Sequence, residues 1–129
     1  MKVSKKTEYG LRAILHLAKN PKKVISLKEI SKKEDISFDY LEKIIGELEK
    51  ANLVKAKKGS QGGYFLARPS NKITPWDIVL VLEEDMATSH CSGCAMAGQC
   101  TSEDIWSEAQ DSFDNTLNAV TLADLIKKK

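Results

Sequence analysis

A helical pattern with a tight break, in residues 26–52, constrains the fold of this chain more than any other feature. The stretch Ser-Leu-Lys-Glu at 26–29 is a capping box, because the serine can accept from the amide three residues on while the glutamate reaches back. It predicts a short helix that ends at a break at Glu34 and Asp35. A longer helix follows with Ser37 as its N-cap and an apolar face formed by Leu41, Ile44, Ile45 and Leu48. Two helices joined in this way are typical of a helix-turn-helix.

A hairpin pattern follows directly. Residues 53–57 alternate apolar and basic side chains, as a half-exposed strand does, and residues 64–67 form the returning strand. The turn between them is the glycine-rich stretch 59–63. A β-hairpin placed directly after a helix-turn-helix makes a winged helix. The fold class that we predict is therefore mainly α with a small β-hairpin wing, a winged helix-turn-helix to which a long dimerisation helix is added.

Charge divides the chain into two parts. Residues 1–72 hold 17 Lys or Arg against 8 Asp or Glu, a net charge of +9, whereas residues 73–129 hold 3 against 10, a net charge of −7. A plain solvated surface would not segregate charge in this way. The segregation indicates that the first part meets a polyanion and the second does not.

The three cysteines all lie in one short segment. Cys91, Cys94 and Cys100 are spaced C-x2-C-x5-C in a stretch rich in glycine and small residues. Thiols gathered in this way suit an inorganic site, and a structural disulfide is not expected in a reducing compartment. Thiolates are soft donors for iron–sulfur clusters and for zinc, and C-x2-C is also a zinc half-site. The residues alone leave both metals open.

A long helix is predicted after the cysteines, from Thr101 onward. Its apolar stripe has no later domain to pack against, so we expect it to pack against a second copy of itself in a two-fold dimer. The alternative is that it packs against its own winged helix. The stripe consists of Ile105, Ala109, Phe113, Leu117 and Val120, with Trp106 beside it. We therefore expect a winged helix-turn-helix DNA-binding domain in residues 1–72, and a cluster-binding loop and dimerisation helices in residues 73–129.

Several motifs together resemble one known family, the IscR/NsrR type of winged-helix regulators. They are Ile-Ser-x-x-Tyr-Leu-Glu at 36–42, Lys-Gly-Ser-Gln-Gly-Gly-Tyr at 58–64, the three-cysteine loop before a helix with tryptophan, and residues 1–12. The resemblance covers nearly the whole chain in the same order. It implies a homodimeric DNA-binding transcriptional regulator, expected to be a repressor, whose cysteines hold an iron–sulfur cluster of the 2Fe–2S or 4Fe–4S type.

The cysteine loop departs from the commonest pattern of that family, because only Ser92 and Gly93 separate its first two cysteines. In IscR-like members the fourth ligand is a histidine three residues after the last cysteine, a position that Glu103 occupies here. The resemblance places that of NsrR-like members at Glu8, on the first helix of the partner subunit. We expect Glu8, with Glu103 as the alternative; His90 and a small molecule such as water or glutathione are further candidates.

The residues expected to contact DNA lie on the second helix of the motif and on the wing. In a winged helix the N-terminal part of that helix enters the major groove. Here that part carries Ser37, Asp39, Tyr40, Glu42 and Lys43. A glutamate such as Glu42 can accept from a cytosine amino group and so specify a base. Lys28, Lys57 and Lys58 are expected to meet phosphates, and Gln61 to reach the minor groove.

The leading hypothesis is therefore a regulator that binds double-stranded DNA with two-fold symmetric half-sites and senses redox state, nitric oxide or iron–sulfur status. The alternative is a winged-helix regulator with structural zinc or redox-reactive cysteines and no cluster. A metalloenzyme is not expected, because the chain has no Ser/His/Asp constellation and no phosphate-binding glycine motif. The N-terminus has no apolar signal region, so we expect a cytoplasmic protein without a membrane partner.

Overall fold

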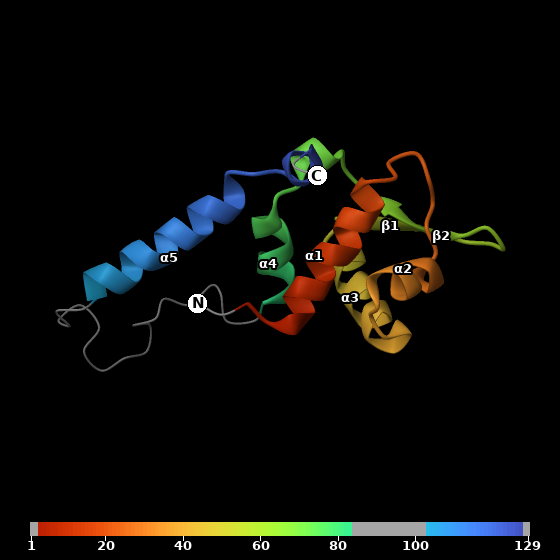
Figure 1. Cartoon of the computed structure of the whole chain (residues 1–129), viewed down its shortest axis with the longest axis horizontal. Coiled ribbons are helices and arrows are strands. Elements are labelled where there is room, and N and C mark those ends of the chain that lie inside the picture. The colour runs from red at the N-terminus through yellow and green to blue at the C-terminus, as the bar shows by residue number, and fades with distance from the viewer. Residues whose placement is uncertain (1–2, 84–102, 128–129) are drawn as a thin grey trace.

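The computed structural model describes residues 3–83 and 103–127. It is mainly helical with one two-stranded antiparallel hairpin, which confirms the predicted fold class (Figure 1). The elements in chain order are α1 (Lys5–Ala18), α2 (Leu27–Glu34), α3 (Phe38–Lys50), β1 (Val54–Lys57), β2 (Gly63–Leu66), the short 3-10 helix η1 (Ser70–Lys72), α4 (Pro75–Leu82), α5 (Glu103–Asn118) and α6 (Leu122–Lys127).

Serine or threonine side chains begin α1, α2, α3 and α4. Each accepts a hydrogen bond from the amide three residues on, as at Ser37, whose hydroxyl accepts from the amide of Tyr40 at 3.2 Å. Thr74 and Asp77 complete both halves of a capping box at the start of α4. At the start of α2 the serine half is present, but the carboxylate of Glu29 turns toward α1 instead.

The break between α2 and α3 occurs where the sequence predicted it. Asp35 has φ 55°, in the left-handed region that short polar residues tolerate. The amide of Ile36 donates to the carbonyl of Ser31 at 3.1 Å, and the Ser31 hydroxyl donates to the carbonyl of Ile36 at 2.5 Å. These two hydrogen bonds stabilise the turn and so fix the orientation of α3 relative to α2.

The hairpin forms the wing, with Val54 opposite Leu66 and Lys57 opposite Gly63. Its second strand is also tied to the segment before α2, because the amide and carbonyl of Tyr64 both bond to Ile25. Gly63 makes this approach possible, since a Cβ there would lie 2.4 Å from the carbonyl oxygen of Ile25. The wing is therefore fixed to the helix-turn-helix at its base.

The core lies among α1, α3 and α4, and it continues beyond residue 72. Ile73, Ile78 and Leu122 are each 0% exposed and belong to the same buried cluster as the helices of the first part. The division into a DNA-binding part and a cluster-binding part at residue 72 stays a prediction. The hydrophobic core itself includes residues on both sides of that boundary.

The helix α5 extends away from this body, as Figure 1 shows. It ends at Asn118, so Val120 of the predicted stripe lies beyond it. Ile105 and Trp106 are 56% and 45% exposed. In the described part of the chain, no helix is both long enough and apolar enough to cross a membrane.

Candidate nucleic-acid interface

The helix α3 has one face in the core and one in solvent. On the inner face Leu41, Ile44, Ile45 and Leu48 are 0% exposed and hold the helix against α1 and α4, whereas Phe38 at its start is 45% exposed. Asp39, Glu42 and Lys43, from the predicted DNA-contacting set, are exposed on the outer face. The packing of the inner face thus sets which polar side chains α3 presents.

Two of the predicted DNA contacts also have structural roles. The exposed Ser37 uses its hydroxyl oxygen as the N-cap of α3. Tyr40 is half-buried and packs edge-on against Tyr9 of α1, with ring centroids 5.8 Å apart. The Arg12 guanidinium lies over the other ring, 5.6 Å from the centroid of Tyr9. Tyr40 therefore helps to join α3 to α1, whatever its hydroxyl contacts.

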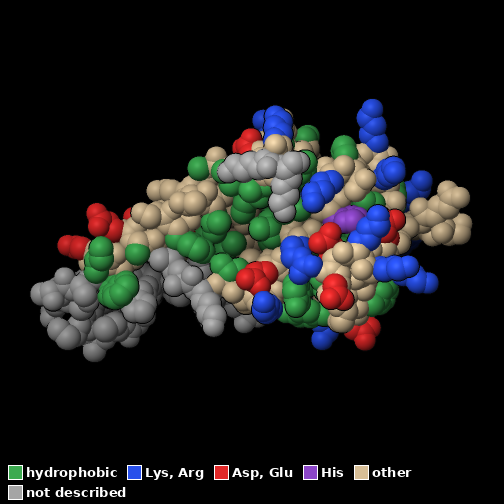
Figure 2. Space-filling model, in the orientation of Figure 1, with side chains coloured by type: hydrophobic (Ala, Val, Ile, Leu, Met, Phe, Trp, Pro, Cys, Tyr) green, Lys and Arg blue, Asp and Glu red, His purple; other side chains and the backbone are tan. Residues whose placement is uncertain are grey.

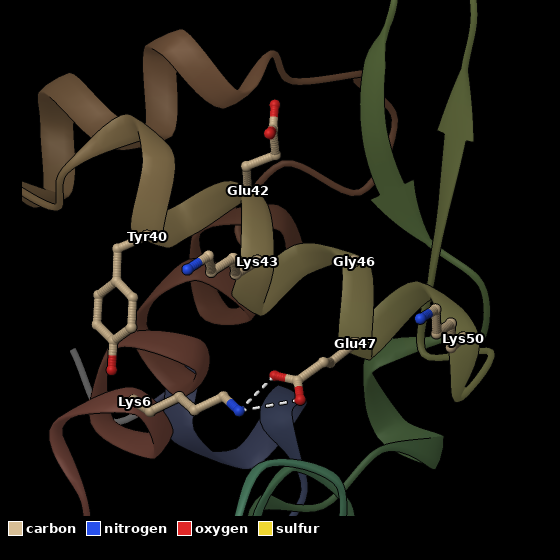
Figure 3. A pocket seen from close by; sticks show the side chains of 7 residues that line it. All are labelled: Lys6, Tyr40, Glu42, Lys43, Gly46, Glu47 and Lys50. Carbon is tan, nitrogen blue, oxygen red and sulfur yellow. Dashed lines mark hydrogen bonds and ion pairs between the residues drawn. The ribbon is translucent and has the colours of Figure 1, made fainter.

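A hollow of about 480 Å³ lies between α3 and the start of α1 (Figure 3). We call it the α1–α3 trough; it is lined by Lys6 of α1 and by Tyr40, Glu42, Lys43, Gly46, Glu47 and Lys50 of α3. Across it the ammonium of Lys6 lies 2.9 Å and 2.7 Å from the two carboxylate oxygens of Glu47. This half-buried ion pair joins the two helices beside the predicted DNA-contacting face.

A buried histidine joins α1 to α2. His16 is 8% exposed, with its Nδ1 3.0 Å from Glu34 and its Nε2 3.4 Å from Glu29. Arg12 also donates to the backbone carbonyl of Glu34 and lies 3.5 Å from its carboxylate. Two carboxylates of α2 are thus held by α1, which explains why Glu29 does not close its capping box.

Basic side chains gather on the body formed by α1, α2 and α3, whereas α5 carries none (Figure 2). Lys28 on α2, and Lys57, Lys58 and Gln61 on the wing, are exposed. At the wing tip Gly59 has φ +116°, a conformation that favours glycine. The surface can therefore accept a polyanion, and the individual DNA contacts stay predictions.

The predicted metal ligands fall mostly outside the described residues. Cys91, Cys94, Cys100 and His90 belong to the segment 84–102, and among the residues that the structure describes no group of three metal-ligating side chains occurs. Glu8 is exposed in the first turn of α1, and its carboxylate lies 3.2 Å from the ammonium of Lys5. Glu103 is the first residue of α5.

One carboxylate fixes the chain just before the cysteine segment. Glu83 accepts from the Ser4 hydroxyl at 2.6 Å, from the Ser4 amide at 3.1 Å and from the buried Thr7 hydroxyl at 2.7 Å. Burial alone would raise the pKa of Glu83, but these hydrogen bonds and the charge of Lys6 outweigh it and lower the pKa. The end of α4 is thereby attached to the first turn of α1, which also carries Glu8.

Sequence reasoning missed three of these features: the trough, the buried His16 and the Glu83 anchor. The partners of Lys6 and of Glu83 lie 41 and up to 79 residues away, so no local pattern reveals them. The one available signal was His16, a polar residue on the apolar side of an amphipathic helix. A buried polar side chain requires partners, and two carboxylates of α2 supply them.

Comparison with known proteins places the chain among regulators. A family model described as Rrf2, iron-dependent transcriptional regulator, matches residues 3–128. The protein rrf2 of Nitratidesulfovibrio vulgaris is 36% identical over 132 residues, which cover 98% of this chain and 88% of that protein.

Two solved structures are similar along almost the whole chain. The structure of CymR, the global cysteine regulator of B. subtilis, has a TM-score of 0.87 and 32% identity, and the match covers 100% of this chain and 98% of CymR. The structure of T. potens IscR has a TM-score of 0.83 and 36% identity, and that match covers 99% of this chain and 88% of IscR.

Proposed function

The chain belongs to the Rrf2 family of transcriptional regulators, and we propose that it is a homodimeric DNA-binding repressor controlled by an iron–sulfur cluster. The observation that carries the proposal is the Glu83 anchor, which attaches the start of the cysteine segment to the helix against which α3 packs. The iron-dependence in the family's description and the similarity to an IscR structure support the choice of cofactor. Its place in the cell is the cytoplasm, where the DNA lies.

The DNA-binding part rests on α3 and the wing. Both present exposed polar or basic side chains from one buried scaffold, with Glu42 and Lys43 on α3 and Lys57 and Lys58 on the hairpin. A dimer would place two such units on one duplex, so that the operator has two-fold symmetric half-sites. The exposed apolar residues of α5 and Leu80 of α4, which is 50% exposed, support a dimer contact at that end of the molecule.

The proposal of an iron–sulfur cluster rests on the side chains that could coordinate it. Cys91, Cys94 and Cys100 would supply three thiolates, and Glu8 of the partner subunit, or Glu103, the fourth ligand. Three soft thiolates and one carboxylate fit an iron–sulfur cluster. When bound, the cluster supplies a site that oxidants, nitric oxide or iron loss can alter. Glu8 is exposed, and the helix dipole at the start of α5 favours an anionic group near Glu103.

Described contacts connect Glu83, just before the cysteine segment, to α3, the helix that we propose reads DNA. Glu83 bonds to Ser4 and Thr7 at the start of α1. The same helix then meets α3 through the Lys6–Glu47 ion pair and through the packing of Tyr9 on Tyr40. A change in the segment after Glu83 can therefore alter the position of α1 relative to α3.

The test compares anaerobically purified, iron-loaded protein with the same protein after iron removal, on one promoter fragment at fixed salt. We expect their affinities to differ by about tenfold, as allosteric coupling typically does. Cys94→Ser should abolish both the iron content and the difference, whereas Ser92→Ala, a matched change in the same segment, should keep both. Equal affinities of the loaded and iron-free protein would refute control by a cluster.

A second candidate is control through cysteine chemistry without a cluster, through structural zinc or redox-reactive thiols. The similarity to CymR, a cysteine regulator by name, favours it. It predicts a colourless protein after anaerobic purification, whose DNA affinity changes on thiol oxidation or zinc removal. Elemental analysis for iron and zinc, combined with the optical spectrum, separates the two candidates.

A further inference from the structure

Gly46 is a glycine that the folded chain does not require. It lies in the middle of α3, where only proline is less favourable than glycine. A Cβ at this position would meet nothing within 4 Å. Each other described glycine has either a positive φ or a Cβ position within 3 Å of another atom. The described fold therefore does not explain why a glycine is present at position 46, and contact with another molecule would explain it.

The surroundings of Gly46 indicate what approaches it. Gly46 lies on the wall of the α1–α3 trough, with Lys43 one turn before it and Lys50 one turn after it on the same helix (Figure 3). Both lysines are exposed. The nearby carboxylate of Glu47 is held by Lys6 from the far side of the trough. Three lysines and two glutamates line the trough, and of these glutamates Glu47 is paired with Lys6 while Glu42 is exposed. The lining therefore keeps a net positive charge, and Lys43 and Lys50 lie on either side of the bare backbone at Gly46.

We propose that the trough takes a phosphodiester of the DNA backbone, which lies against Gly46 between Lys43 and Lys50. Glycine is favoured where a ligand must approach the helix backbone closely, because it has no side chain to stand in between. Lysine ammonium groups are point charges suited to phosphate oxygens. This inference rests on the DNA-binding part of the proposed function and is independent of the cluster.

At Gly46 itself, a base edge is a poor occupant. Bases are read by side chains that match their donors and acceptors, and Gly46 offers no side chain. Phosphate contacts position the protein and carry no sequence information. The trough should therefore contribute equally to binding of all sequences, in contrast to the predicted role of Glu42, which also lines it.

The test places glutamine at Gly46, with Glu49→Gln as the matched control. Glu49 is exposed on the same helix and does not line the trough. Binding to a short random-sequence duplex at low salt is measured by fluorescence anisotropy, and thermal stability by circular dichroism. Gly46→Gln should raise the melting temperature, because helix propensity improves. It should also weaken DNA binding by about tenfold or more, the size of a lost charged hydrogen bond.

The control should bind as tightly as the unaltered protein or more tightly, because it removes a negative charge. A second variant, Lys50→Ala, should lower the slope of log affinity against log salt by about one. Destabilisation by Gly46→Gln would overturn the inference, because the glycine would then have a structural role. So would unchanged affinity, or a loss confined to particular sequences.

The two proposals fail in different ways. If the unaltered protein does not bind random duplex at low salt, both the trough and the DNA-binding part of the proposed function are wrong. If it binds and Gly46→Gln binds equally well, only the trough inference is wrong. Control by a cluster is judged by the separate comparison of iron-loaded and iron-free protein.

Discussion

The helices α3 and α5 are both amphipathic, of 13 and 16 residues, but they use their apolar faces differently. Four apolar side chains of α3 are 0% exposed within one chain. In contrast, no residue of α5 from 104 to 118 is fully buried, and Ile105 is 56% exposed. The structural role of α3 is thus complete in a monomer, which leaves its charged face for another molecule. The apolar face of α5 is only partly covered within the described residues, and the proposed dimer would cover it further.

The sharpest test of this comparison truncates one isoleucine in each helix. Ile44→Ala in α3 should lower the free energy of unfolding by about 2–4 kcal/mol, because it leaves a cavity in a packed core. Ile105→Ala in α5 should change it by less than about 0.5 kcal/mol in dilute protein. Chemical denaturation at low protein concentration measures both. Equal losses would show that α5 is as well packed as α3.

Self-association tests the other half of the comparison. Ile105→Glu should weaken the dimer by on the order of 2 kcal/mol, because a charge enters an apolar contact. Ser107→Glu adds the same side chain to an exposed position two residues on and should have little effect. Analytical ultracentrifugation over a range of concentrations measures the change. If both variants dimerise like the unaltered protein, α5 is not the contact.

The Glu83 anchor links the body that holds α3 to the segment that leads to α5. Glu83→Gln should cost about 1 kcal/mol of stability, the net value of a hydrogen bond to a charged group at a partly exposed site. Because the pKa of Glu83 is lowered from its ordinary value of 4.5, its stabilisation is present above that pH. This stabilisation is lost below pH 4.5, as the pH falls through the lowered pKa of the folded protein and Glu83 becomes protonated.

Denaturation curves from neutral to acidic pH test this dependence. The unaltered protein should lose its advantage over the Glu83→Gln variant as Glu83 becomes protonated. Asp111→Gln, at an exposed position of α5, serves as the control and should not change the pH dependence in this way. If the stability difference between the unaltered protein and Glu83→Gln stayed constant at every acidic pH measured, the lowered pKa of Glu83 would be wrong.

The smallest expected effect concerns the wing. Lys58→Ala should weaken binding to all DNA sequences alike and reduce the salt slope by about one, as the loss of one phosphate contact does. The control is Lys127→Ala, an exposed lysine at the end of α6, for which the slope should not change. A change in sequence preference with Lys58→Ala would mean that the wing reads bases.

Local patterns predicted the elements that are built from neighbouring residues. The cap at Ser37 and the turn at Asp35 depend on bonds between residues a few positions apart, and they were found where expected. The reciprocal half of the capping box at Glu29 was wrong, because the carboxylate found a buried histidine on another helix. The bond from Glu29 to its own helix start is weaker than the need of the buried His16 for a hydrogen-bond partner.

The sequence by itself determined the helix-turn-helix, the wing and the segregation of charge, because each depends on local spacing or on composition. It also indicated the family, through the resemblance of its motifs. Only the tertiary structure decided that Lys6 meets Glu47 across a trough and that Glu83 joins α4 to α1. It also showed that Gly46 has open space around it. These features depend on which side chains the core brings together. Packing of apolar faces sets that arrangement, and polar partners far apart in sequence then find one another.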